Sequence, residues 1–202
     1  MMNPLDKIVS QSVKEVLEED LGSRTYKKVE KELDEMFGIS VLDAAGDFSK
    51  LDIVLRTLFG KHSTKMEMKI FKKIIALEKK EKDESSLVIK DPIIATKIFE
   101  SYGDPVKKSI LDVLQKHPKS IPEAISETQL PQASTYRRAK ELIQDGLLTM
   151  VGHTQASDGR KVSEYTTTLN RAVFDVQDKG LFVNIKLHNK FLKDSFAYNS
   201  IT

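Results

Sequence analysis

The sequence predicts a mainly helical protein with a small β part, in which an N-terminal helical bundle precedes a more mixed C-terminal half. Three observations support this prediction. Apolar residues recur at spacings of three and four along residues 3–80, which is the period of a helix with one buried face. Helix start and stop signals then repeat between residues 104 and 146. Segments rich in β-branched and aromatic residues, separated by turn residues, follow at residues 147–187.

The composition is that of an ordinary globular chain with room for one large or two small domains. The 202 residues are 40% apolar and 31% charged. There is no cysteine, which excludes a disulfide scaffold, a thiolate zinc site and a cysteine nucleophile. The apolar runs are too short for a membrane span, and the N-terminus lacks the pattern of a signal peptide. We therefore expect a soluble cytoplasmic protein.

The net charge of +2 divides unevenly along the chain. Residues 1–103 carry 18 basic and 19 acidic side chains, whereas residues 104–202 carry 14 basic and 11 acidic ones. Non-specific affinity for DNA comes largely from neutralised phosphates. A nucleic-acid-binding module with so small an excess of positive charge would depend on dimerisation and on a few well-placed Arg and Lys side chains.

Three helices are predicted in the segment that begins at residue 104. Asp104-Pro105 can cap and open the first helix, which His117-Pro118 ends. Ser120-Ile121-Pro122-Glu123 has the spacing of a capping box and opens a short second helix. Leu130-Pro131 forces a turn, because a residue before proline is disfavoured in a helix, and a third helix follows at residues 132–145. Two short helices joined by such a turn form a helix-turn-helix.

The residues after the third helix predict a β-hairpin. Residues 147–151 are apolar and include β-branched side chains, residues 157–160 (Ser-Asp-Gly-Arg) are turn formers, and residues 162–168 are rich in Val, Tyr and Thr. A hairpin directly after a helix-turn-helix is a wing. The order of elements therefore predicts a winged helix-turn-helix at residues 104–168.

This segment also resembles a known superfamily. The residues that carry the resemblance are Leu130-Pro131-Gln132, Ser134-Thr135-Tyr136-Arg137-Arg138, Glu141-Leu142 and Asp145-Gly146-Leu147-Leu148. They resemble the arsenic-repressor-like winged-helix domains that are common in archaeal transcription regulators, over roughly a third of the chain. The resemblance implies DNA binding, although the same fold also serves as a protein-docking module.

Residues 3–80 are predicted to form a compact helical domain. Helices are expected from Asn3-Pro4 to Gly22, from Ser23 or Thr25 to Gly38, and near residues 40–45 and 49–59. A capping-box candidate at residues 64–67 (Thr-Lys-Met-Glu) would open a long helix with apolar residues inward as far as Leu77.

The N-terminal helical domain has a resemblance of its own. It rests on Asn3-Pro4-Leu5, Leu21-Gly22, Phe37-Gly38-Ile39, Phe48, Leu51 and Leu58-Phe59-Gly60. These residues resemble the Nitrosopumilus output domain, which occurs beside signalling or DNA-binding modules in ammonia-oxidising archaea. The resemblance implies the setting of an archaeal regulator and supplies no functional residues.

We expect four parts along the chain. They are a helical sensing or dimerisation domain at residues 1–85, a connector at 86–103, a winged domain with an extra hairpin at 104–187, and a tail at 188–202. The connector should hold a short strand at Leu87-Val88-Ile89 and one helix. Lysines between residues 61 and 82 alternate with acidic residues, which favours a solvated helix surface over a second nucleic-acid face. Residues 79–86 are almost wholly polar and are expected to form the joint between domains.

A second hairpin is predicted at residues 172–187, around the turn Gln177-Asp178-Lys179-Gly180. A lone hairpin is marginal in water, so this one should pack on the wing sheet or pair with another subunit. The tail carries apolar side chains such as Phe191 and Phe196 and should either dock within the chain or form a dimer contact.

The third helix and the wing hold the candidate DNA-binding residues. Helical spacing places Thr135, Ala139, Leu142 and Ile143 toward the core, which leaves a polar outer face. The predicted DNA-binding residues are Gln132, Ala133, Ser134, Tyr136, Arg137, Arg138, Lys140, Arg160 and Lys161. His153 and Gln155 are weaker candidates in the wing.

Each candidate has chemistry suited to one part of the duplex. Arg137 can contact guanine O6 and N7, Gln132 can contact adenine N6 and N7, and Ala133 can meet a thymine methyl group. Ser134, Arg138 and Lys140 are better suited to backbone phosphates, and Tyr136 to a phosphate or sugar. Arg160 and Lys161 suit a minor groove or phosphate. A solvated helix face and an ordinary loop are the alternative interpretation.

The sequence therefore predicts a homodimeric transcription regulator that binds double-stranded DNA, with its third helix in the major groove and its wing on the flanking backbone. An unidentified effector or protein partner would act at the N-terminal domain. The alternative is a winged-helix protein-interaction module of transcription machinery that reads no bases. No enzyme, metal or cofactor is expected, because phosphate-loop and serine-elbow motifs are absent and the four histidines, His62, His117, His153 and His188, stand far apart.

Overall fold

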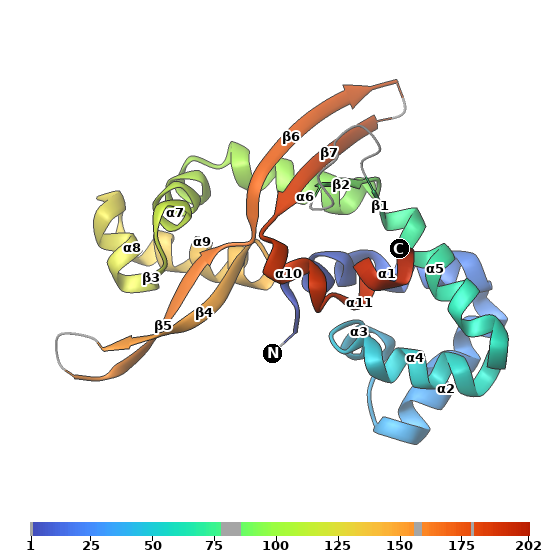
Figure 1. Cartoon of the computed structure of the whole chain (residues 1–202). Coiled ribbons are helices and arrows are strands. Elements are labelled where there is room, and N and C mark those ends of the chain that lie inside the picture. Colours follow the sequence, from blue (N-terminus) through green and yellow to red (C-terminus); the bar gives the residue numbers. More distant parts are fainter. Residues whose placement is uncertain (1, 78–85, 156–158, 179) are drawn as a thin grey trace.

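The computed structural model describes residues 2–77, 86–155, 159–178 and 180–202 (Figure 1). The chain is mainly helical with two antiparallel sheets, so the predicted fold class of mainly α with a small β part is confirmed. The helices are α1 (Pro4–Leu21), α2 (Ser23–Phe37), α3 (Val41–Ala45), α4 (Phe48–Phe59), the 3-10 helix η1 (Gly60–His62), α5 (Ser63–Ile74), α6 (Pro92–Gly103), α7 (Pro105–Lys116), α8 (Ile121–Thr128), α9 (Gln132–Gln144), α10 (Asn189–Lys193) and α11 (Phe196–Ile201). The strands are β1 (Ile75–Leu77), β2 (Ser86–Ile89), β3 (Lys119–Ser120), β4 (Leu148–Gln155), β5 (Lys161–Thr167), β6 (Leu169–Gln177) and β7 (Gly180–Leu187).

Helix α1 lies at the centre of the molecule. Asn3 caps it, because the Asn3 side chain accepts a hydrogen bond from the Leu5 N–H at 2.9 Å, and Pro4 occupies its first turn. Ile8 and Leu17 of its apolar stripe are fully buried, as predicted, whereas Leu21 at its end is only partly buried. The helix contacts α2, α3, α5, α6, α10 and α11. Within the described residues, no helix is long and apolar enough to cross a membrane.

Helix α5 differs from its prediction at both ends. It begins at Ser63 without a side-chain cap, so the capping box expected from Thr64 is wrong, and Glu67 is buried at 6% exposure. It ends at Ile74, and Ile75–Leu77 forms β1, so the helix expected to reach Leu77 is shorter. The reason is tertiary: a short run of apolar residues suits a helix or a strand, and β2 supplies a pairing partner here.

The first sheet has the order β1-β2-β7-β6 and is antiparallel throughout. The short strand predicted at Leu87-Val88-Ile89 is confirmed as β2. The extra hairpin is confirmed as β6 and β7, but β7 pairs with β2 rather than with the sheet that contains β4 and β5. The expected division between residues 85 and 86 passes between β1 and β2 of this sheet. Residues 78–85, which include most of the expected joint and three of the lysines, lie outside the described residues.

The second sheet has the order β3-β5-β4 and belongs to the segment that begins at residue 104. In this segment, the helix caps predicted from the sequence at Asp104 and Ser120 are confirmed. Asp104 accepts hydrogen bonds from the N–H groups of Val106 and Lys107, and Ser120 forms a capping box with Glu123. Along the chain the elements follow as α7, β3, α8, α9, β4 and β5, and α7 contacts both α8 and α9.

The tail docks within the chain, which is the first of the two predicted alternatives. The Asp6 carboxylate accepts hydrogen bonds from the Ser195 hydroxyl at 2.7 Å and from the N–H groups of Phe196 and Ala197, both at 2.9 Å. Burial raises the pKa of Asp6, against the lowering effect of these three bonds. The Phe196 ring lies 5.8 Å from the Phe48 ring and packs in the same core.

Candidate nucleic-acid interface

Helix α9 presents one face to the core and one to solvent. Thr135, Ala139 and Leu142 are buried, as the helical spacing predicts. The Thr135 hydroxyl donates to the Pro131 carbonyl at 2.8 Å, so even the buried polar group at the helix start is satisfied. This contact fixes the first turn of α9 against the turn that follows α8.

The solvent face of α9, which we call the outer face, holds the residues predicted for it. Six of the candidate side chains on this helix are exposed: Gln132, Ala133, Ser134, Tyr136, Arg137 and Lys140. Tyr136 is 39% exposed, and the Arg137 side chain is 66% exposed. The Ser134 hydroxyl donates to the Pro131 carbonyl at 2.9 Å. The outer face thus offers amide, phenol, guanidinium and ammonium groups to one side of the helix.

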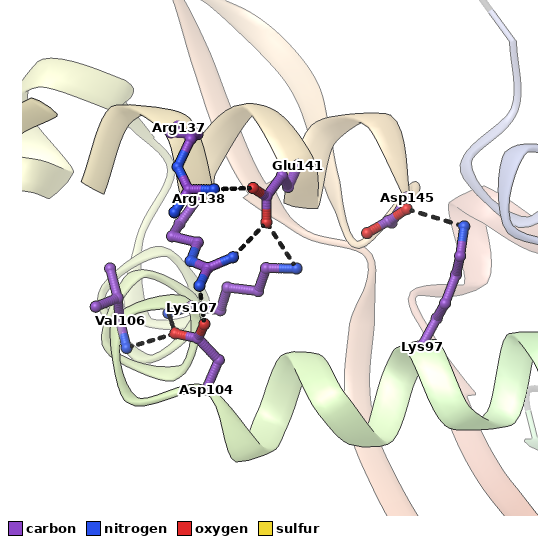
Figure 2. A network of polar contacts seen from close by, with 8 residues as sticks. All are labelled: Lys97, Asp104, Val106, Lys107, Arg137, Arg138, Glu141 and Asp145. Carbon is purple, nitrogen blue, oxygen red and sulfur yellow. Dashed lines mark hydrogen bonds and ion pairs between the residues drawn. The ribbon is translucent and has the colours of Figure 1, made fainter. Parts of the chain in front are cut away.

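The side of α9 that meets α7 carries a network of charged groups (Figure 2). Glu141 accepts from Arg138 at 2.9 Å, pairs with Lys107 at 3.1 Å and lies 3.4 Å from an Arg137 nitrogen. Arg138 also pairs with Asp104 at 3.0 Å. The hydrogen bond from Arg138, and then the Lys107 ammonium, hold the pKa of Glu141 below its usual value.

This network engages Arg138, for which a contact with a backbone phosphate is predicted. Its side chain is 31% exposed and lies between two carboxylates, so it joins α9 to the start of α7 and is not on the outer face. Asp104 serves both as the cap of α7 and as a partner of this guanidinium. Of the two adjacent arginines, Arg137 is therefore the one that points into solvent.

The other end of α9 is attached to the N-terminal helices. The Gln11 side chain of α1 donates to the Asp145 carbonyl oxygen at 2.9 Å, and Lys97 of α6 lies 3.6 Å from the Asp145 carboxylate (Figure 2). Gly146 has a φ of 77°, and a Cβ added there would lie 3.2 Å from the Ile8 nitrogen. Sequence reasoning missed this attachment, since no local pattern links residues so far apart.

The β4–β5 hairpin projects away from the rest of the chain (Figure 1). Lys161 lies opposite Gln155, and His153 lies opposite Ser163. Arg160 and Lys161 are exposed. Residues 156–158, which include the first half of the predicted turn, lie outside the described residues.

Two adjoining cavities lie between the start of α1 and β4, and the larger one extends to the tail. Their volumes are about 550 and 340 Å³, and both are lined by Met2, Pro4, Thr149 and Met150. The larger also touches Asp6, Phe48, Lys190, Asp194 and Phe196. It is therefore mainly apolar with a few charged groups at its margin, which is the usual character of a small-molecule site. Among the described residues, no group of three or more His, Asp or Glu side chains could hold a metal ion.

Comparison of the chain with models of protein families, with curated proteins and with solved structures gave no match.

Proposed function

We propose that residues 104–168 are a winged helix-turn-helix domain that binds double-stranded DNA, within a homodimeric cytoplasmic transcription regulator. The observation that supports this most strongly is the exposed polar outer face of α9, a helix that is joined by polar contacts to α7, α1 and α6. The order α7, β3, α8, α9, β4 and β5, with β3 completing the sheet of the hairpin, is the order expected of such a domain.

In this proposal α9 enters the major groove. Arg137 contacts the O6 and N7 of guanine, Gln132 contacts adenine, and Ala133 meets a thymine methyl group. Lys140, Ser134 and Tyr136 contact the phosphate backbone, which sets the register of the helix without reading sequence. Arg160 and Lys161 in the wing contact the flanking backbone or minor groove. Arg138 acts indirectly, because its pairs with Asp104 and Glu141 hold α9 at its angle to α7.

A dimer is needed to give this domain useful affinity. Because residues 104–202 have only three more basic than acidic side chains, one copy supplies a weak electrostatic attraction. Two copies place two α9 helices in successive major grooves, at half-sites about 34 Å apart.

The N-terminal helices would pass a signal to α9. Helix α1 contacts the end of α9 through Gln11 and Ile8, and the 550 Å³ cavity lies between α1 and β4 of the proposed wing. A ligand in this cavity that favoured one arrangement of α1 and β4 would shift the population of the DNA-binding state.

The test is a genome-wide binding selection with the purified protein at physiological salt, repeated with Arg137→Ala. We expect recovery of a short inverted repeat, and a loss of about 1–3 kcal/mol in the variant with relaxed specificity at one base position. Arg24→Ala is the matched control, because Arg24 is an exposed arginine on α2, away from α9, and its removal changes the net charge equally. Arg24→Ala should leave the selected sequence unchanged.

If no sequence is enriched, or if both variants bind alike, the outer face of α9 does not read bases. The winged segment would then be a protein-docking module, and a partner protein should lose affinity on Arg137→Ala instead.

A further inference from the structure

Among the described strands, β6 lies at an open edge of the first sheet, beside β7 (Figure 1). It is nine residues long and contains neither proline nor lysine, the residues that most often protect an edge. An unprotected edge offers backbone N–H and C=O groups to another strand. The strand that could pair with β6 depends on which of its residues direct their backbone N–H and C=O groups to the open edge.

The direction in which each backbone group of β6 points can be derived from one hydrogen bond at the opposite edge of the same sheet, beside β1 and β2. The Lys90 N–H donates to the Ile74 carbonyl at 2.8 Å, so these two residues form a hydrogen-bonded pair just beyond β1 and β2. In antiparallel pairs, residues alternate between bonding to one neighbouring strand and bonding to the other. Within β2, Val88 therefore bonds toward β1, and Leu87 and Ile89 bond toward β7.

The same alternation carries across β7 to β6. Leu87 and Ile89 pair with Ile185 and Val183, so the intervening residues of β7 bond toward β6. Their partners on β6 have odd numbers, from Arg171 to Gln177. The even-numbered residues of β6, which are Ala172, Phe174 and Val176, therefore direct their N–H and C=O groups to the open edge. The Asn170 carbonyl also turns away from β7, since it accepts from the Gln115 side chain at 2.9 Å.

The charges on β6 are self-complementary. Arg171 and Asp175 are exposed, on the same face, and equally distant from Val173. When a second copy of β6 lies antiparallel with Val173 opposite the partner's Val173, each Arg171 lies opposite the partner's Asp175. Opposite charges in such cross-strand positions are stabilising, and like charges are destabilising.

This register also pairs the backbone groups at the centre of β6. It places Ala172 opposite the partner's Phe174, and both residues direct their polar groups to the open edge, so they can form a hydrogen-bonded pair. If the two-fold axis passed through Ala172 or Phe174, one charged side chain would lie opposite a valine. If it passed through Arg171 or Asp175, two like charges would lie opposite each other. The charges therefore select the register centred on Val173.

The surroundings of β6 are apolar enough for such a contact. The Phe174 ring lies 5.3 Å from the ring of Phe99 on α6, and Phe99 is 50% exposed. Val173 and Val176 are 38% and 79% exposed. A second copy centred on Val173 would remove these side chains from water in part.

We propose that the chain dimerises by antiparallel pairing of β6 with β6 of a second copy, about a two-fold axis through Val173. The inference names the dimer contact of the regulator proposed above and rests on that proposal for the role of the dimer. The pairing itself requires no DNA, so it is tested without DNA.

The first test uses single cysteines, because the chain has no cysteine of its own. Val173 would be a non-hydrogen-bonded pair with its counterpart, at a Cα separation of about 4.5 Å, which a disulfide can span. Val173→Cys should form a disulfide-linked dimer under mild oxidation. Val176→Cys is the matched control. The Val176 side chain is more exposed than that of Val173, but the proposed register places position 176 of one copy about 20 Å from position 176 of the other. Cross-linking that is absent at position 173, or equal at both positions, would overturn the proposal.

The second test measures the dimer Kd by analytical ultracentrifugation, with the fold monitored by circular dichroism. Arg171→Glu and Asp175→Arg should each raise the dimer Kd by about tenfold, because each creates two like-charge pairs across the axis. The double variant reverses both charges and should restore the original Kd to within about threefold. A monomer at every concentration, or a dimer indifferent to all three variants, contradicts the β6 contact. A confirmed β6 dimer that selects no DNA sequence would instead refute the DNA-binding function alone.

Discussion

At the scale of single residues, Glu67 is a buried carboxyl group whose pKa lies well above its usual value. It lies on α5, is 6% exposed, and one of its carboxyl oxygens has no hydrogen-bond partner among the described residues. Burial, followed by a hydrogen bond with Asp52, raises the pKa of Glu67 to about 8, while Arg56 opposes the rise. The Glu67 carboxyl therefore binds a proton at neutral pH in the folded protein.

This raised pKa predicts a loss of stability with rising pH. Between about pH 4.5 and pH 8 the folded state holds the Glu67 proton and the unfolded state does not, so the free energy of unfolding falls as the pH increases through this window. Glu67→Gln keeps a neutral donor at this position and should raise the free energy of unfolding by roughly 1–3 kcal/mol above pH 8. Urea unfolding at pH 5 and pH 9 measures the effect.

The control for this prediction is Glu35→Gln, at a side chain that is 57% exposed on α2. It should change the pH dependence little. Equal slopes of stability against pH in the Glu67→Gln variant and the unchanged protein would show that the Glu67 proton is not held.

At the scale of elements, the junction of α9 with α1 depends on a glycine. Gly146 has a φ of 77°, which other residues adopt at a cost, and a Cβ would meet the Ile8 nitrogen and the Pro4 carbonyl oxygen, each at 3.2 Å. Both are backbone atoms of α1, so neither can move without moving the helix. The glycine allows α1 to lie directly on the end of α9.

Gly146→Ala should therefore lower the free energy of unfolding by about 3 kcal/mol, since backbone strain and overpacking add. Gly38→Ala is the matched control, because Gly38 also follows a helix in the left-handed region, with a φ of 64°, but has no atom within 4 Å of an added Cβ. It should cost about 1 kcal/mol, the backbone term alone. Thermal and urea unfolding of both variants measure the difference, and equal losses would rule out the close approach of α1 to α9.

At the scale of the whole molecule, the two halves of the chain share one sheet and one core. Strand β2 pairs with β1 on one side and with β7 of the C-terminal hairpin on the other, and the tail returns to α1 through Asp6. The buried apolar residues of the described chain, except Ile125, form one cluster that extends from Leu5 to Ile201. Elements from both halves of the sequence are therefore needed to complete the first sheet and the core.

This arrangement predicts a single cooperative unfolding transition. In differential scanning calorimetry the calorimetric and van't Hoff enthalpies should agree, as they do for one cooperative unit. A fragment of residues 1–85 should not fold alone. The backbone groups of Ile75 and the rest of β1 would lose their partners on β2 and be exposed to solvent, and α1 would lose its contacts with α6 and the tail. Two separate transitions, or a folded fragment by circular dichroism, would show that the halves are independent.

The sequence by itself determined the helix caps, turns and buried helix faces, because these features depend on residues only a few positions apart. The caps at Asp104 and Ser120 and the turn before Gln132 act through hydrogen bonds and steric contacts within one helical turn, so the helices around them could be predicted. Helical periodicity likewise placed Thr135 inside and Arg137 outside.

The tertiary structure alone decided the features that join residues distant in the chain. Ile75–Leu77 became a strand because β2 pairs with it, and the second hairpin pairs with β2 because those apolar strands offer it an edge. Arg138 faces Asp104 rather than solvent because α7 crosses α9 there, and the tail docks because Asp6 accepts three of its donors. Such partners leave no mark in the local pattern, since the energy of each contact depends on two segments that only folding brings together.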